Sequence, residues 1–236
     1  MSSKPTWQYD ESKQVGTDYA SQAEIEAYDE SMRSLRNTRG ENEHILGALE
    51  LAPESTVIEI GTGTGEFAIA AAARCATVYA LDISEAALEY ARRKALERGA
   101  KNIEFKHGGF LTYEHGGKPV DAVVSQLALH HLPDYWKAVA LGRVCDLLRV
   151  GGRLFLRDAV FPSDVRNRSE YFEKWISGVE RVAGAELARQ VEAHIRDEYS
   201  TLDWIMEGRL RSAGFSIRSA GYGRGLFASY LCVKNP

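Results

Sequence analysis

Residues 56–66 read TVIEIGTGTGE, and this stretch decides the fold of the 236-residue chain. Its first five residues are β-branched or apolar around one acid, a composition typical of a short buried strand. Three glycines at alternate positions follow, and they let the backbone turn tightly and approach a ligand closely. The alanine-rich run from Phe67 to Cys75 predicts a helix directly after the turn. We therefore expect a strand, a ligand-binding glycine loop and a helix, in that order.

Strands and helices alternate along the chain after this motif. Four more strands are predicted at residues 77–81, 103–106, 120–125 and 153–157, with helices at 84–98 and 133–148. This order implies a parallel sheet with helices on both faces. The last two predicted strands, 215–220 and 227–233, are joined by a link that is too short for a parallel crossover. The expected fold class is thus α/β, with a seven-stranded, mostly parallel sheet that ends in an antiparallel hairpin.

Two segments lie outside this alternation. Residues 1–54 form an N-terminal segment with helical periodicity from Tyr19 to Leu51, and residues 55–236 form the main domain with a helical insertion at about 161–200. Aromatic residues from Tyr171 to Val182 are typical of packing, but the insertion is also placed to form a helical lid. In that alternative, Tyr28 and Arg33 would gate the site of one ligand. The residues that would line the site of a second ligand are His194, Glu198, Tyr199 and Trp204.

Composition excludes several classes of partner. The formal net charge is -4, and the longest basic run, Arg92-Arg93-Lys94, has an acid nearby on each side. We therefore expect no nucleic acid partner. The three cysteines are far apart without metal-ligand spacing, so no metal is expected. The N-terminus lacks the apolar run of a signal peptide, and no segment is long enough to span a membrane. The expected location is the cytoplasm.

Acidic residues surround the glycine loop. Its third glycine comes one residue earlier than in the G-x-G-x-x-G pattern, whose helix binds a pyrophosphate. Glu59 and Glu66 would repel a pyrophosphate, whereas they suit a cofactor that carries a sulfonium and an ammonium group. Asp82 ends the second predicted strand, where a carboxylate can accept hydrogen bonds from both hydroxyls of a ribose.

On these motifs, residues 55–234 resemble the class I S-adenosylmethionine-dependent methyltransferases. The resemblance is carried by E-x-G-x-G-x-G at 59–65, Asp82-Ile83, SQLALHHLPD at 125–134 and LRVGGRL at 148–154. It implies a Rossmann-like fold and S-adenosyl-L-methionine as the cofactor. The residues that it assigns to the cofactor are Glu59, Gly61, Thr62, Gly63, Gly65, Asp82, Ile83, Gly109, Phe110, Gln126 and Leu127.

The resemblance also implies what each part of the site holds. The glycine loop would hold the methionine part, Asp82 the ribose and Ile83 the adenine. The end of the fourth strand would meet the amino-acid end of the cofactor. One position departs from the family, because Gly109 stands where many members have an acid that bonds the adenine amino group. Adenine recognition would then depend on the Phe110 amide, on His107 or on neighbouring side chains.

Methyl transfer requires alignment, and a general base only where the acceptor must lose a proton. The catalytic candidates are His130 and His131, which follow the fourth strand, and Asp158, which with Arg157 ends the fifth and could orient a polar substrate. Loop packing and helix capping are the alternative roles. The leading hypothesis is methylation of a small molecule. No N-P-P-Y-like segment follows the fourth strand, which disfavours the amino groups of nucleic-acid bases and of glutamine as acceptors. The alternatives are an enzyme that uses the cofactor for other chemistry, such as a lyase, and a cofactor-sensing binding module. The acceptor atom (O, N, C or S) and the oligomeric state stay open.

Overall fold

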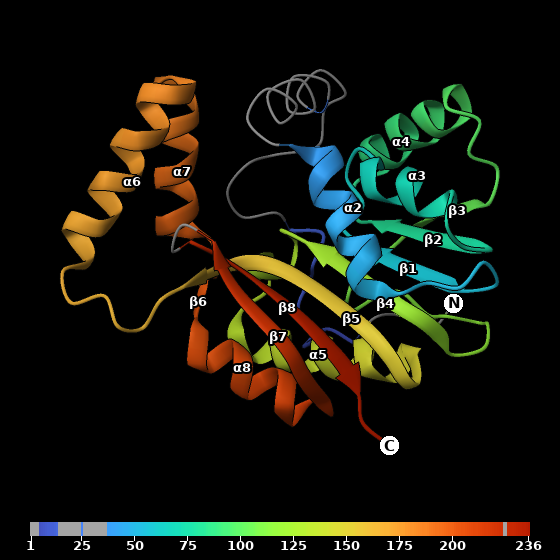
Figure 1. The fold of residues 1–236 in the computed structure, drawn as a ribbon. Coiled ribbons are helices and arrows are strands. Elements are labelled where there is room, and N and C mark those ends of the chain that lie inside the picture. The colour runs from blue at the N-terminus through green and yellow to red at the C-terminus, as the bar shows by residue number, and fades with distance from the viewer. Residues whose placement is uncertain (1–4, 14–24, 26–36, 224–225) are drawn as a thin grey trace.

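The computed structural model describes residues 5–13, 25, 37–223 and 226–236, and in these residues the chain forms one twisted sheet with helices around it (Figure 1). The strand order is β3-β2-β1-β4-β5-β8-β7, with the short β6 paired to the end of β5. Strands β1 to β5 run parallel, and β8 runs antiparallel to both β5 and β7. The seven predicted strands and the antiparallel hairpin are confirmed.

The strands have these bounds: β1 Thr56–Ile60, β2 Thr77–Asp82, β3 Ile103–His107, β4 Val120–Gln126, β5 Leu148–Phe161, β6 Thr201–Leu202, β7 Phe215–Gly223 and β8 Phe227–Lys234. The helices have these bounds: α2 Thr38–Leu49, α3 Glu66–Ala72, α4 Glu85–Glu97, η1 Leu129–His131, α5 Asp134–Leu147, α6 Arg168–Ala183, α7 Ala185–Asp197 and α8 Asp203–Ser212.

Two apolar clusters hold the sheet between its helices. On one face, α2 and α3 pack on the central strands through residues such as Leu46, Phe67 and Val124. On the other face, α5 and α8 pack through residues such as Leu141, Leu210 and Tyr230. Because the central strands are buried on both faces, their sequences are almost continuously apolar rather than alternating.

The structure corrects three details of the expected elements. β5 begins at Leu148 and runs to Phe161, so it is longer than the predicted strand 153–157. The insertion contains two helices, α6 and α7, separated at Gly184, whose φ of +88° a helix does not tolerate. The strand β6 was not predicted, since two residues carry no periodicity. The predicted helix at Tyr19–Arg36, with Tyr28 and Arg33, lies outside the described residues apart from Ile25.

The topology fixes where a ligand can bind. The chain order reverses at the centre of the sheet, since β1 has β2 on one side and β4 on the other. In open α/β sheets, ligands bind at the carboxyl ends of the strands at such a reversal. Among the described residues, no helix is long and apolar enough to cross a membrane.

Candidate active site

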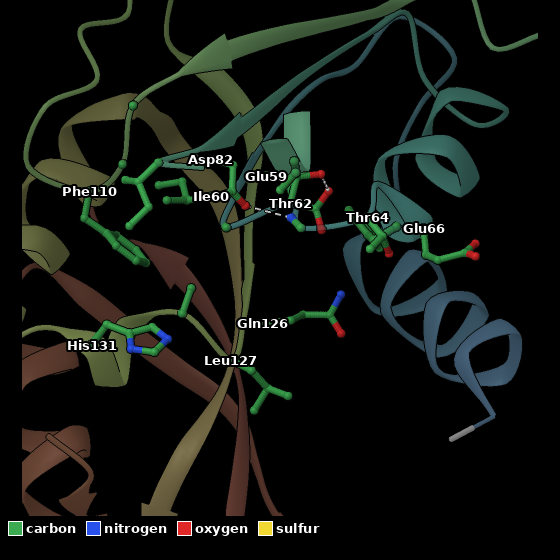
Figure 2. A pocket seen from close by; sticks show the side chains of 18 of the residues that line it. Glu59, Ile60, Thr62, Thr64, Glu66, Asp82, Phe110, Gln126, Leu127 and His131 are labelled. Atoms are coloured by element: carbon green, nitrogen blue, oxygen red, sulfur yellow. Dashed lines mark hydrogen bonds between the residues drawn. The ribbon is translucent and has the colours of Figure 1, made fainter. Parts of the chain in front are cut away.

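A pocket opens at the carboxyl ends of β1, β2 and β4, at the reversal point of the sheet (Figure 2). Ten of the eleven residues that the resemblance assigned to the cofactor line it; these are Glu59, Gly61, Thr62, Gly63, Asp82, Ile83, Gly109, Phe110, Gln126 and Leu127. The remaining lining residues include Glu11, Ile25, Thr38, Asn42, Thr64, Glu66 and His131. The fold therefore gathers residues from separate parts of the sequence, from Glu11 to Leu132, around one cavity.

Hydrogen bonds hold the glycine loop in a shape in which its inner face lines the pocket. The amides of Gly61 and Thr62 donate to the carbonyl of Leu81 at 2.9 and 2.8 Å, which fastens the loop to the end of β2. The hydroxyl of Thr62 donates to Glu59 at 2.6 Å. The amide of Gly63 donates to a carboxylate oxygen of Asp82 at 2.8 Å. These hydrogen bonds within the protein define the shape of the loop.

Two of the three loop glycines, Gly63 and Gly65, have different surroundings. Gly63 has a φ of +52°, and a Cβ added there would meet nothing within 4 Å, because this position faces the cavity. At Gly65, with a φ of +77°, a Cβ would lie 2.9 Å from the Cβ of Ala91. Gly65 therefore allows α3 and α4 to approach closely and does not line the pocket. Its assignment to the cofactor stays a prediction, and its packing against Ala91 is what the structure adds.

Asp82 joins the loop to the start of α4. One carboxylate oxygen accepts the Gly63 amide, and the other accepts the amide of Ser84 at 2.9 Å. Burial raises the pKa of Asp82, and the hydrogen bonds from Ser84 and Gly63 oppose that rise. Ser84 caps α4 as predicted, since its hydroxyl accepts the Ala87 amide at 3.2 Å. Asp82 thus lines the pocket with a carboxylate that is already bonded to the loop and to α4.

The two acids of the loop are in different states. Burial raises the pKa of Glu59 to about 8, although the hydrogen bond from Thr62 opposes this rise. Glu66 instead pairs with Lys94 at 2.9 Å and with Arg98 at 2.8 Å. Although burial acts to raise it, these partners lower the pKa of Glu66 to about 2. Glu66 therefore also connects α3 to α4, and its expected role in favouring a cationic cofactor stays a prediction.

The N-terminal residue Glu11 was missed by the sequence analysis. Only 6% of it is exposed, and its carboxylate accepts the Leu111 amide at 3.1 Å and the Thr112 hydroxyl at 2.6 Å. A Cβ at Gly109 would lie 2.6 Å from a Glu11 carboxylate oxygen. Glu11 thus fills the space that a side chain at Gly109 would take. The only sequence signal for Glu11 was Gly109, which stands where many family members have an acid.

The end of β4 carries backbone strain. Leu127 has a φ of +55°, a conformation that a non-glycine residue adopts rarely, and its amide donates to the Arg157 carbonyl at 2.8 Å. Gln126 and Leu127 both border the pocket (Figure 2). Such strain tends to cluster at functional sites. The Arg157 side chain pairs with Glu41 of α2 at 2.8 Å, and its role in orienting a substrate stays a prediction.

The catalytic candidates form one buried cluster of which only His131 lines the pocket. His130 Nδ1 lies 2.5 Å from Asp158, and His130 Nε2 lies 3.2 Å from Glu198. Burial would lower the pKa of His130, but Asp158 and Glu198 raise it to about 9. Burial and the charge of His130 lower the pKa of His131 to about 4. His194 also contacts Glu198.

The other two residues proposed for the acceptor side, Tyr199 and Trp204, do not line the pocket. Trp204 is 63% exposed. Tyr199 lies beside the histidine cluster, since its amide donates to the His130 carbonyl at 3.0 Å, and its own carbonyl accepts a hydrogen bond from the buried Lys137. No described residue of α6 or α7 lines the pocket either, and α6 has no buried residue. A lid function for the insertion stays a prediction.

Comparison with known proteins identifies the family. Residues 57–152 match the family described as "Methyltransferase domain". An uncharacterized methyltransferase from Geobacillus sp. strain WCH70 is 30% identical over 193 residues, which cover 82% of this chain and 83% of the relative. The chain belongs to the class I S-adenosylmethionine-dependent methyltransferases. S-adenosylmethionine is accordingly the cofactor of this methyltransferase.

Solved structures agree with the fold of the methyltransferase. The YcgJ protein from Bacillus subtilis has a TM-score of 0.65 at 15% identity, over 84% of this chain and 99% of that protein. Magnesium protoporphyrin IX methyltransferase from Synechocystis, solved with S-adenosylmethionine bound, has a TM-score of 0.61 at 19% identity, over 87% of this chain and 84% of that protein. At these identities the likeness concerns the fold.

Proposed function

We propose that this methyltransferase methylates a small molecule, held in the same pocket as the cofactor. The observation that carries the proposal is the composition of the pocket. The glycine loop, Asp82 and Phe110 belong to the residues assigned to the cofactor, and Leu132 and His131 line the same pocket. S-adenosylmethionine supplies an activated methyl carbon, so Leu132 and His131 need only align an acceptor and exclude water. The net charge of -4 supports an acceptor other than a nucleic acid.

The pocket residues fit the cofactor in the manner that the resemblance implies. The open space at Gly63 gives the methionine part room, and the Asp82 carboxylate, which lines the pocket, suits the ribose hydroxyls. His131 is the catalytic candidate placed to touch an acceptor, while His130 and Asp158 stand behind it. These assignments are part of the proposal.

Product analysis tests the function against its alternatives. The protein is incubated with S-adenosylmethionine and a metabolite extract, and the products are separated by mass spectrometry. We expect S-adenosylhomocysteine together with a methylated small molecule. Cleavage to methylthioadenosine would indicate lyase-type chemistry, and cofactor binding without turnover would indicate a sensing module. Methylation of added RNA or protein alone would contradict the small-molecule acceptor.

Glu11 is proposed to take over adenine recognition from the acid that is absent at Gly109. A carboxylate accepts a hydrogen bond from an exocyclic amino group, whereas it repels a carbonyl oxygen in the same place. We therefore expect the protein to prefer S-adenosylhomocysteine over its deaminated analogue, S-inosylhomocysteine, by about tenfold or more, the value of one charge-assisted hydrogen bond.

Glu11→Gln should reduce that preference, because an amide can turn either a donor or an acceptor toward the base. Calorimetric titration of both ligands measures it. Glu104→Gln is the matched control, since Glu104 pairs with Lys106 in an exposed position on β3 outside the pocket lining. An unchanged preference in Glu11→Gln would assign Glu11 to loop structure alone.

Cofactor binding is expected to release a proton from Glu59. Because burial raises the pKa of Glu59 to about 8, the group is largely protonated near neutral pH. The cofactor ammonium favours the carboxylate and so lowers this pKa on binding. Affinity should then rise with pH up to about 8 and level off above it. Calorimetry in two buffers with different ionisation enthalpies measures the released proton. Glu59→Gln should abolish the release, and a release that persists in this variant would assign it to another group.

A further inference from the structure

A cluster of metal-binding side chains lies behind the acceptor side of the pocket. His130 and His131 come from η1, and Glu198 follows α7. One ligand atom of each of these three residues lies within 4.8 Å of the others. Two nitrogen or oxygen ligands of a tetrahedral zinc ion, each bonded at about 2.1 Å, lie roughly 3.4 Å apart. Small side-chain rotations therefore bring the three groups to metal-binding distance.

The surroundings of His130 match those of a metal-bound histidine. A ligating histidine usually donates its second ring N–H to a carboxylate, which fixes its orientation. Here Asp158, with 1% of its side chain exposed, lies 2.5 Å from His130 Nδ1. This contact leaves Nε2 as the ligand atom. His194 contacts Glu198 and would hold that carboxylate in the same way.

His131 provides an independent observation. Its Nδ1 atom is buried and has no hydrogen-bond partner among the described residues. Buried polar atoms in native proteins almost always have one. An ion-pair network accounts for the contacts among His130, Asp158 and Glu198 but leaves two buried atoms, His131 Nδ1 and Asp158 Oδ2, without a partner among the described residues. A metal ion shared by the two histidines and Glu198 would engage the nitrogen.

We propose that His130, His131 and Glu198 bind a divalent transition-metal ion, with zinc as the best fit. Two histidines and one glutamate form a ligand set of catalytic zinc sites, in which the fourth position takes water or substrate. His131 borders the pocket. If the proposed function holds, the ion would stand beside the acceptor and could polarise an oxygen, nitrogen or sulfur atom before methylation.

Metal titration of the purified protein tests the proposal without cofactor or acceptor. The protein is first treated with a chelator and then titrated with Zn²⁺ by calorimetry and with Co²⁺ by visible absorption. We expect one Zn²⁺ per chain and the d–d bands of a site with nitrogen ligands. Asp158→Asn should weaken the affinity about 10–100-fold, as loss of an outer-shell partner does. His131→Ala and Glu198→Gln should weaken it further.

Two controls keep the outcome decisive. His44→Ala removes an exposed histidine on α2, remote from the cluster in sequence, and should leave Zn²⁺ affinity unchanged. Circular dichroism checks that each variant is folded, and His131→Ala suffices if the changes at Asp158 or Glu198 prevent folding. Equal Zn²⁺ affinity in the wild type and His131→Ala would overturn the proposal and leave an ion-pair network. Because turnover is not measured, this result is independent of whether the protein methylates small molecules.

Discussion

Gly63→Leu is expected to abolish S-adenosylmethionine binding while the protein stays folded. A Cβ at this position meets no protein atom within 4 Å, so the new side chain would enter the space proposed for the cofactor. The φ of +52° adds strain of about 1–2 kcal/mol, since the side chain must adopt a left-handed conformation. Calorimetric titration with the cofactor measures the first effect, and thermal unfolding measures the second.

Gly99→Leu separates the two effects. Gly99 follows α4 with a φ of +71°, and a Cβ there also meets nothing within 4 Å. The two variants therefore carry similar strain, but only Gly63 lines the pocket. Gly99→Leu should lose stability and keep its affinity for the cofactor. If both variants bound S-adenosylmethionine like the wild type, the cofactor could not lie against the loop.

The central part of this site could be predicted because its signals are local in sequence. A strand, three alternating glycines and a helix occupy consecutive residues, and Asp82 ends the next strand. Parallel topology then brings the strand ends to one edge. The order of these motifs along the chain was therefore enough to place the loop and Asp82 beside one another.

The parts that were missed depend on tertiary contacts. Glu11 reaches the pocket from the N-terminal segment, and nothing in its own neighbourhood marks it as buried. Glu66 faces two cations on α4, and this pairing follows from how α3 packs rather than from the loop sequence. Gly65 resembles the other loop glycines in sequence, yet it contacts Ala91. The hydrophobic periodicity and the spacing of motifs carry no information about partners that are distant in sequence.

The cluster around His130 shows the same limit. His130 and Asp158 were each chosen as candidates from their positions at strand ends, but their contact could not be read from the sequence. Glu198 was proposed only as a lining residue of the acceptor side. The structure instead places it against His130 with 5% of its side chain exposed. Neither the cysteine spacing nor the adjacent His130 and His131 indicates a metal site by itself, so the sequence predicted none.

Asp82→Asn is expected to weaken S-adenosylmethionine and S-adenosylhomocysteine by similar factors, about tenfold or more. Hydrogen bonds to a charged group contribute about 1.5–3 kcal/mol each, and the ribose is common to both ligands. Calorimetric titration of the two ligands measures the losses. Ser84→Ala is the control on α4, because it removes the helix cap but keeps the backbone amide that Asp82 accepts. It should leave both affinities nearly unchanged.

The structure adds a complication, since Asp82 also fixes the Gly63 amide, and loosening the loop would weaken both ligands too. A cycle that combines the Asp82→Asn change with a change in the ligand, on the principle of a double-mutant cycle, separates the two roles. An S-adenosylhomocysteine analogue without its two ribose hydroxyls should bind the wild type weakly. If Asp82 holds the ribose, Asp82→Asn should weaken this analogue much less than it weakens S-adenosylhomocysteine. Equal losses for the two ligands would mean that Asp82 acts only by shaping the glycine loop. Losses that differ between S-adenosylmethionine and S-adenosylhomocysteine would mean that Asp82 responds to the sulfonium charge.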